Sequence, residues 1–349
     1  MLLNVLLNFF AVYFVCAIFN SLFIFFIVFF ALIILNCEIL SLFSLFQEKN
    51  ILILSFIEFF VSFLTCLKLK GNPFKVFNFK EIKKESSKIK NILLKNKVLL
   101  VLGICFLIML FSYFILAFFS PVLEPDCRMY HFARVFNYVQ QGNFFHFSTN
   151  EIRNTVLPLN SEMVYSYFYV FKKNDVGYGF LSYFSFLFSI VGIYLTFLIL
   201  KIQRKKALFS IFLFSALPLV LVQIPSLQTD LVVLALTIST IYLFILSFKN
   251  SKKENLNFLY FSSLAYALCL GVKTTAIVNF ISVLLILLSY IVIYRRKVFK
   301  REVKFLFYFI FFLVLNFTVF SSFNYILNYL EWHNFIAPKS FILEHKGEN

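Results

Sequence analysis

The segment EPDCRMYHFARVFNYVQQGN, residues 124–143, gathers side chains that can move protons and hold anions. It contains two carboxylates, Glu124 and Asp126, together with two arginines, two tyrosines and one histidine. A carboxylate can act as a general base, and an arginine can hold phosphate oxygens through two parallel hydrogen bonds. Because the segment directly follows an apolar run at 98–120, we expect this chemistry close to a membrane surface.

Apolar residues inside this segment recur at helical spacing. Those between 127 and 141 form one stripe, made of Met129, Phe132, Val135, Phe136 and Val139. The Gly-Asn pair at 142–143 ends the pattern, and a second apolar stretch at 163–171 is rich in tyrosine and phenylalanine. The two stretches predict two amphipathic helices that lie on the membrane surface.

The polar face of the first predicted helix carries the reactive groups. Tyr130 and Arg134 are four residues apart and share that face, with His131 beside them. Asp126 comes just before the helix, where the helix dipole favours an anion. A purely structural interpretation stays open, in which Asp126 is an N-cap and the arginines, Arg134 among them, only anchor the chain to headgroups.

The composition identifies a polytopic membrane protein. Of the 349 residues, 61% are hydrophobic and only 14% are charged, and the mean hydropathy is +0.89. A soluble domain cannot bury so much apolar surface. The net charge of +16 does not indicate nucleic-acid binding, because the basic residues concentrate in short loops between apolar runs, where they direct topology and contact anionic lipids. Five of the six cysteines lie in or beside apolar runs and predict no disulfide framework.

Long apolar runs predict the membrane spans. The runs are 22–46, 51–68, 98–120, 177–200, 207–224, 231–248, 256–271, 275–294 and 305–321. Residues 1–46 as a single helix would measure ~69 Å, against a hydrocarbon core of ~30 Å. Residues 2–19 are therefore a further candidate span with a turn near Asn20 and Ser21, and they lack the basic start and cleavage site of a signal peptide.

Basic segments predict the topology. They are the lysine-rich stretch 68–97 and the shorter stretches 201–206, 249–255 and 294–304. If all four are cytoplasmic, an even number of spans must separate each from the next, and this is what the apolar runs provide. We therefore predict N-terminal membrane helices (1–70), a basic cytoplasmic loop (71–97), a core (98–321) with an outer loop (121–176), and an extracytoplasmic tail (322–349).

Two further charged residues fall on the predicted outer face. Asp230 ends the short turn 224–230, and Lys273 lies in the turn 271–275 between two apolar runs. An ionisable residue at such a position is costly and indicates function by default. Each also has a plain structural interpretation, Asp230 as an N-cap and Lys273 as a lysine that reaches along its stem to the interface. Their occurrence on the same face as Asp126 favours a common site.

These residues occur in an order that resembles the GT-C superfamily of polytopic glycosyltransferases, and most closely a family-39-like branch. That branch is related to protein O-mannosyltransferases and the lipid A aminoarabinose transferase, and it has an Asp-x-x-x-Tyr-His-x-x-Arg segment after a span. The matching positions are Asp126, Tyr130, His131, Arg134, Gly142 and Pro158. The runs 148–154, 228–230, 271–275 and 323–338 also resemble motifs of the branch, so that the resemblance covers roughly residues 98–338.

The resemblance implies a core of seven transmembrane helices preceded by two or three N-terminal helices. It also implies an inverting transfer of a hexose or pentose from a polyprenyl-phosphate-linked donor to a lipid, glycan or protein acceptor, on the outer side of a bacterial cytoplasmic membrane. Asp126 would be the general base. The remaining residues of the implied site would bind donor or acceptor: Glu124, Tyr130, His131, Arg134, Arg153, Asp230 and Lys273. A divalent metal held by carboxylates and histidine stays open.

Two other functions are consistent with the same sequence. A transporter or flippase of a lipid-linked or anionic substrate would carry polar residues inside its spans. Glu38 and Glu58 are residues of this kind, and both lie outside the seven-span core. A non-catalytic member of the superfamily is the second alternative. It is favoured by the short stretch after 321 and by the placement of Glu124 two residues before Asp126 instead of next to it.

Overall fold

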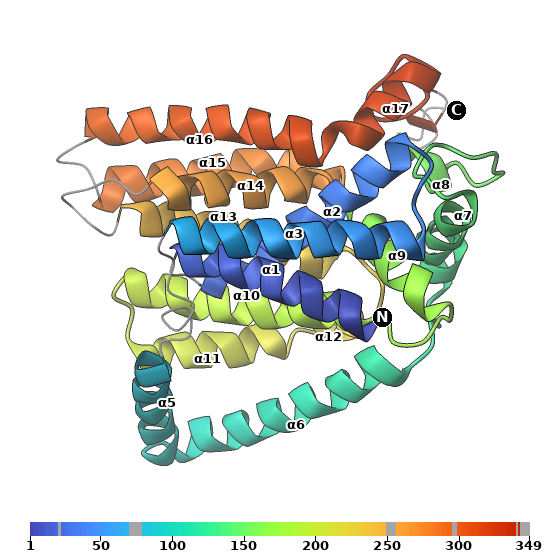
Figure 1. Cartoon of the computed structure of the whole chain (residues 1–349). Coiled ribbons are helices and arrows are strands. Elements are labelled where there is room, and N and C mark those ends of the chain that lie inside the picture. The colour runs from blue at the N-terminus through green and yellow to red at the C-terminus, as the bar shows by residue number, and fades with distance from the viewer. Residues whose placement is uncertain (20–21, 70–78, 249–255, 295–298, 340, 343–349) are drawn as a thin grey trace.

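The computed structural model describes residues 1–19, 22–69, 79–248, 256–294, 299–339 and 341–342. Within these residues the chain is helical almost throughout, and Pro121 and Val176 form one isolated antiparallel bridge. Eight of the described helices are long and apolar enough to cross a membrane. The predicted all-α polytopic membrane fold is therefore confirmed (Figure 1).

The N-terminal part of the chain contains three long helices. They are α1 (Leu2–Phe19), α2 (Phe25–Leu42), which follows a short 3₁₀ turn η1 (Leu22–Ile24), and α3 (Glu48–Lys68). α1 is a separate helix that packs against α3. The first apolar run is thus divided between α1, which ends at Phe19, and α2, while the predicted turn at Asn20 and Ser21 lies outside the described part of the chain.

The remaining crossings form the core of the bundle. Their helices are α6 (Lys97–Phe119), α10 (Phe180–Ile199), α11 (Arg204–Ser215), α12 (Pro218–Gln223), α13 (Asp230–Ser247), α14 (Leu256–Leu270), α15 (Thr275–Tyr294) and α16 (Phe299–Phe320). α13 lies at the centre and packs against α10 and α14. Gly192 allows this packing, because a Cβ there would lie 2.6 Å from Cγ2 of Ile238. In contrast, α6, α15 and α16 expose large apolar side chains, as helices in contact with lipid do.

The predicted span 207–224 is two helices instead of one. α11 ends at Ser215, and α12 begins at Pro218. Proline has no amide hydrogen for a continuing helix, and its ring forces the preceding residue out of the helical region. Leu217 accordingly has an extended backbone with ψ 125°. The sequence pattern missed the break because both halves are apolar, so hydropathy alone does not separate them.

All helices of the bundle run between two ends, which we call the α7 end and the α5 end after the helices found there (Figure 1). α5 (Phe79–Leu94) lies across its end of the bundle instead of running along the long helices. The helix termini that flank the four basic segments all lie at the α5 end, together with α5 itself. The described helix ends that lead into the basic segments therefore share one side, while residues 70–78, 249–255 and 295–298 lie outside the described part of the chain.

Segment 121–176 folds over the α7 end beside α17 (Ser322–Trp332) (Figure 1). It contains the π-helical turn η2 (Cys127–Phe132), α7 (Ala133–Gln141), α8 (Arg153–Val156) and α9 (Asn160–Lys172). Gly142 ends α7 with a φ of +73°, a conformation that glycine adopts without strain. Met129 and Phe136 are exposed and Val135 is buried, so the predicted stripe of the first helix divides between the surface and the protein interior.

α9 lies deeper than the predicted surface helix at 163–171. Residues 160–167 are all buried, and the helix packs against α2 and α7. Polar contacts explain this position. The Tyr167 hydroxyl accepts a hydrogen bond from Asn8 of α1 at 2.8 Å and lies 2.9 Å from the hydroxyl of Ser55 in α3. Tyr167 of this aromatic stretch therefore binds the N-terminal helices, and α1 and α3 support the segment that carries the candidate site.

Candidate functional site

The eight predicted site residues all lie at the α7 end of the bundle. The chain just before η2 carries Glu124 and Asp126, and η2 itself carries Tyr130 and His131. Arg134 lies at the start of α7, and Arg153 begins α8. Asp230 is the first residue of α13, and Lys273 lies in the turn between α14 and α15. Segment 121–176, the start of α13 and the turn between α14 and α15 thus meet at one end of the molecule (Figure 1).

Asp126 presents an open carboxylate. Its side chain is 57% exposed, and its Oδ1 lies 3.8 Å from a guanidinium nitrogen of Arg153. The residue is helical, and its carboxylate accepts no capping hydrogen bond. Asp126 thus stands at the N-cap position of η2, as the structural interpretation expects, but without the side-chain capping bond. An uncommitted carboxylate beside a cation is free to accept a proton from a substrate hydroxyl.

Arg153 connects Asp126 to Tyr130. Its guanidinium carbon lies 4.9 Å from the centre of the Tyr130 ring, and Glu151 accepts hydrogen bonds from two of its nitrogens, each at 2.9 Å. Burial, together with the charges of Glu162 and Asp126, raises the pKa of Tyr130 to about 12. The Tyr130 hydroxyl is thus protonated at neutral pH and can donate a hydrogen bond to a ligand.

A buried charge cluster lies behind this open group. Oε1 of Glu162 is 2.6 Å from Nδ1 of His131 and 3.1 Å from Nη1 of Arg134. His131 and Arg134 are three residues apart at the junction of η2 and α7, which brings them to one face. Burial alone would raise the pKa of Glu162, but the Arg134 charge and the His131 hydrogen bond outweigh it and hold the pKa below the usual carboxyl range.

Arg134 also binds the backbone that leads into α9. Its Nη2 donates to the carbonyl of Leu157 at 2.5 Å, and its Nη1 donates to that of Pro158 at 3.2 Å. The side chain is fully buried, unlike the exposed polar face that the sequence predicted. Tyr130 lies beside Arg153, whereas Arg134 binds Glu162 and the backbone before α9, so Tyr130 and Arg134 have different partners. Arg134 therefore holds α7, α8 and α9 together.

The Glu162 cluster predicts an acid-sensitive stability. The pKa of Glu162 is lower in the folded chain than in the unfolded chain. Its contribution to folding stability is therefore complete above the pKa of the unfolded chain and is lost as the pH falls through the pKa of the folded chain. We expect the melting temperature of the wild type to exceed that of Glu162→Gln by a margin that narrows from about pH 7 to about pH 3, because glutamine does not titrate. A margin that stays constant would contradict a depressed pKa.

Glu124 is held by two neighbours. Its Oε1 accepts from the side-chain amide of Gln228, and its Oε2 accepts from the thiol of Cys127 at 3.2 Å. Burial and the charge of Glu124 raise the pKa of Cys127 to about 12, so the thiol remains a donor. Glu124 is thus fixed in place between η2 and the turn that precedes α13.

Asp230 and Lys273 form a pair. The lysine nitrogen donates to Oδ1 of Asp230 at 2.6 Å, and the amide of Gln223 donates to Oδ2 at 3.2 Å. Thr229, not Asp230, is the N-cap residue of α13. Asp230 therefore does not cap α13, and Lys273 binds a carboxylate of the protein instead of simply reaching toward the interface. The side chains are 45% and 35% exposed, which leaves both accessible to a ligand.

Short connections link the segments that carry these groups. Gln228, which binds Glu124, is two residues before Asp230. The carbonyl of Gly271, two residues before Lys273, accepts from the backbone N–H of Asn160 at 2.9 Å, and Asn160 is two residues before Glu162. These links connect neighbouring segments at the α7 end, but among the described residues no hydrogen bond or ion pair joins Asp126 or Arg153 directly to Asp230 or Lys273.

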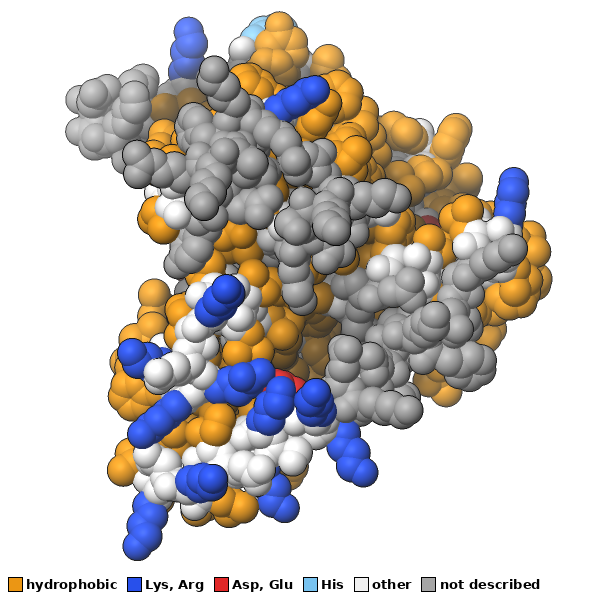
Figure 2. Space-filling model, turned by 90° about the vertical axis from the view of Figure 1, so that its left-hand side faces the viewer, with side chains coloured by type: hydrophobic (Ala, Val, Ile, Leu, Met, Phe, Trp, Pro, Cys, Tyr) orange, Lys and Arg blue, Asp and Glu red, His pale blue; other side chains and the backbone are white. Residues whose placement is uncertain are grey.

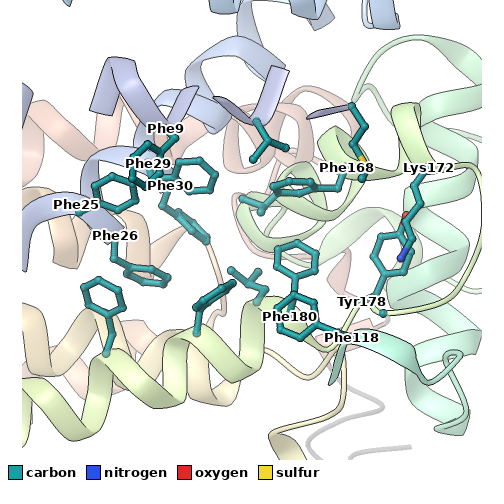
Figure 3. A pocket seen from close by; sticks show the side chains of 17 residues that line it. Phe9, Phe25, Phe26, Phe29, Phe30, Phe118, Phe168, Lys172, Tyr178 and Phe180 are labelled. Carbon is teal, nitrogen blue, oxygen red and sulfur yellow. The ribbon is translucent and has the colours of Figure 1, made fainter. Parts of the chain in front are cut away.

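Two apolar cavities meet at the chain between α9 and α10, and one of them includes a candidate site residue. The larger has a volume of about 490 Å³ and is lined mainly by phenylalanines of α1, α2, α9 and α10, with Lys172 and Tyr178 at one edge (Figure 3). The smaller, of about 380 Å³, lies between α6, α12 and the turn after it, and Glu124 forms part of its wall. Tyr178 lines both cavities. Hydrocarbon is the ligand that such linings favour.

In the described part of the chain, no group of three or more histidine, cysteine, aspartate or glutamate side chains converges to hold a metal ion. Glu124 binds Gln228 and Cys127, His131 binds Glu162, and Asp230 binds Lys273 and Gln223. The residues present do not fit a metal centre, and the chemistry below involves protein side chains alone.

Comparison with known families identifies the core. Residues 161–320 match the family model of the dolichyl-phosphate-mannose-protein mannosyltransferases. The resemblance to GT-C glycosyltransferases is confirmed. The match indicates a membrane glycosyltransferase of GT-C type, and it agrees with the helical membrane fold. It includes Glu162, Asp230 and Lys273, whereas Asp126 lies before its first residue. Neither the curated proteins nor the solved structures give a significant match.

Three residues that contact the candidate site were not predicted from the sequence. Glu162 was missed although it is the one carboxylate in the apolar and aromatic stretch of α9, a signal of the same kind as Lys273. Gln223 and Gln228 were missed because an uncharged amide near a helix end is common and carries no such signal. Their role is visible only from their contacts with Asp230 and Glu124.

Proposed function

We propose that this protein transfers a sugar from a polyprenyl-phosphate-linked donor to a hydroxyl group of a lipid, glycan or protein acceptor, with inversion at the anomeric carbon. The family match supports a membrane glycosyltransferase and a lipid-linked donor. The observation that carries the proposal is Asp126, an exposed carboxylate that makes no capping bond and lies beside Arg153 at the α7 end.

In the proposed reaction, Asp126 is the general base. Its carboxylate takes the proton of the acceptor hydroxyl as the acceptor oxygen forms a bond to the anomeric carbon of the donor. The bond from that carbon to the phosphate oxygen breaks on the opposite side, and its electron pair stays on the leaving polyprenyl phosphate. Asp126 then gives its proton to water. Arg153 and the protonated Tyr130 hydroxyl are positioned to hold sugar or phosphate oxygens.

Glu124, His131 and Arg134 have supporting parts in this proposal. Glu124 is held at the wall of the smaller apolar cavity, where it faces the first part of a bound donor. His131 and Arg134 act through Glu162, and so fix the helix that presents Asp126 and Tyr130. We assign the first isoprene units to the smaller cavity, and the larger cavity on the other side of Tyr178 offers hydrocarbon space for the rest of the tail.

The α7 end is proposed to face away from the cytoplasm, in a bacterial cytoplasmic membrane. The helix termini next to all four basic segments lie at the opposite, α5 end. Segments rich in lysine and arginine stay preferentially on the cytoplasmic side. Labelling of a single cysteine introduced at Thr149, by a reagent that does not cross membranes, would test this in intact cells, and labelling only after permeabilisation would contradict it.

Lys273 is proposed to stabilise the negative charge that develops on the leaving phosphate. Removal of one such donor typically lowers a rate by about 100-fold or more. We therefore expect Lys273→Met to lower transfer by about 100-fold and Lys273→Arg to retain more of it. Lys205→Met, which removes an exposed lysine from the α5 end, is the matched control. Equal activity of Lys273→Met and the control would contradict the assignment.

The overall function is tested by reconstitution. Purified protein in liposomes is incubated with polyprenyl-phosphate donors carrying a labelled sugar and with membrane extracts as the acceptor source. We expect the label to move from the donor to another molecule, and polyprenyl phosphate to accumulate in equal amount. Movement of the intact donor across the bilayer without sugar transfer would instead favour a flippase, and neither activity would favour a non-catalytic protein.

A further inference from the structure

The α5 end contains a second ligand-binding feature, far from the proposed catalytic site. A groove of about 360 Å³ lies between α5, α6, α10 and α11, and its lining is apolar, with Ile89, Leu93, Gly103, Ile104 and Phe212 among its residues. This volume falls within the ~300–1,000 Å³ that is usual for small-molecule sites. A wall with almost no polar surface suits hydrocarbon.

Two polar side chains, one of them basic, lie at the mouth of this groove. A shallower cavity of about 280 Å³ shares Ile89, Leu93 and Leu100 with the groove and adds Ser86 and Lys90 to the lining. Ser86 and Lys90 are one helical turn apart on α5 and lie on the same face. An apolar channel that ends beside a hydroxyl and an ammonium group matches an amphiphile with an anionic head.

The surrounding charge strengthens this match. Lysine and arginine side chains gather over the region of α5 on this end of the molecule (Figure 2). Glu85 forms a paired contact with Arg204, at 2.6 and 3.2 Å, and also binds Lys88 and Tyr194. The Arg204 hydrogen bond is the main reason that the pKa of Glu85 is lowered to about 2, so the contact fastens α5 to α10 and α11 at all physiological pH values. The groove is therefore built on a fixed helix.

We propose that this groove binds an anionic membrane phospholipid, with its phosphate against Ser86 and Lys90 and one acyl chain between α5, α6 and α11. The location suits a lipid because α5 lies across the end of helices that expose apolar side chains along their length. The site is separate from the proposed transfer reaction, which takes place at the opposite end of the bundle.

The site is tested by native mass spectrometry of the full chain, released from bilayers that contain equal amounts of phosphatidylglycerol and phosphatidylcholine. We expect a retained lipid that is mainly phosphatidylglycerol. Lys90→Gln is expected to lower this retention about fivefold, the effect of one lysine at an anionic membrane surface. Lys84→Gln, which removes an exposed lysine of the same helix that does not line the groove, is expected to leave retention unchanged.

A second pair of variants tests the acyl-chain part of the groove. Gly103→Leu fills it from within, since a Cβ there would have ordinary contacts at 3.6–3.8 Å, and Ile104→Trp fills it from the exposed side of α6. Both are expected to lower retention while the protein still elutes as a single folded species. Equal retention of the two lipids by the wild type, or equal loss in Lys84→Gln and Lys90→Gln, would overturn the proposal.

Discussion

Asp126→Asn is expected to lower sugar transfer by about 100- to 10,000-fold, the range that a general base contributes. The amide has nearly the same shape as the carboxylate but cannot accept the proton of the acceptor hydroxyl. Since the Asp126 side chain is mostly exposed and its Arg153 contact is long, at 3.8 Å, the fold should tolerate the change. The measurement is the initial rate of label transfer from a polyprenyl-phosphate donor, with donor binding measured in parallel.

Asp175→Asn is the matched control for this prediction. Asp175 belongs to the same segment. Its backbone carbonyl, not its side chain, accepts the hydrogen bond from the backbone N–H of Val122. The control should therefore transfer at close to the wild-type rate. A similar rate for Asp126→Asn would remove Asp126 as the base, and Glu124→Gln would then be the next variant to measure.

The long helices of this fold were predictable because each is a simple apolar run. α3, α6 and α10 begin and end within a few residues of the predicted spans, since charged residues bound the runs. Three features were not predictable in this way. The break before Pro218 lies between two apolar helices, the π-helical turn depends on local hydrogen bonding, and the burial of α9 depends on partners in α1 and α3.

The site was predictable where a charge stood in an apolar setting. Asp230 and Lys273 were singled out for that reason, and the structure joins them at 2.6 Å. Sequence reasoning could not rank the arginines, because Arg134 and Arg153 look alike in a polar loop. Burial distinguishes them: Arg134 is enclosed with Glu162, whereas Arg153 remains accessible beside Asp126. Contacts between distant segments thus decide which cation can reach a substrate.

Glu331→Gln is the reference variant for the stability effect expected of Glu162→Gln. Like Glu162, Glu331 pairs with a histidine, His146, but its side chain is 49% exposed. An exposed ion pair contributes at most about 1 kcal/mol. We therefore expect the melting temperature of this variant to stay within a few degrees of the wild type, by roughly the ~2–4 °C that corresponds to 1 kcal/mol.

Glu162→Gln is expected to destabilise the protein far more, by roughly 3–5 kcal/mol, because it leaves the Arg134 charge buried without a counter-charge. The melting temperature in detergent should fall by roughly 10 °C. The double variant Arg134→Met with Glu162→Met removes both charges and should recover much of this loss, since apolar replacement of a buried pair is often neutral. If the double variant is stable but still transfers sugar poorly, Glu162 positions the helix that carries Asp126. If Glu162→Gln alone is as stable as Glu331→Gln, the buried cluster does not hold the fold.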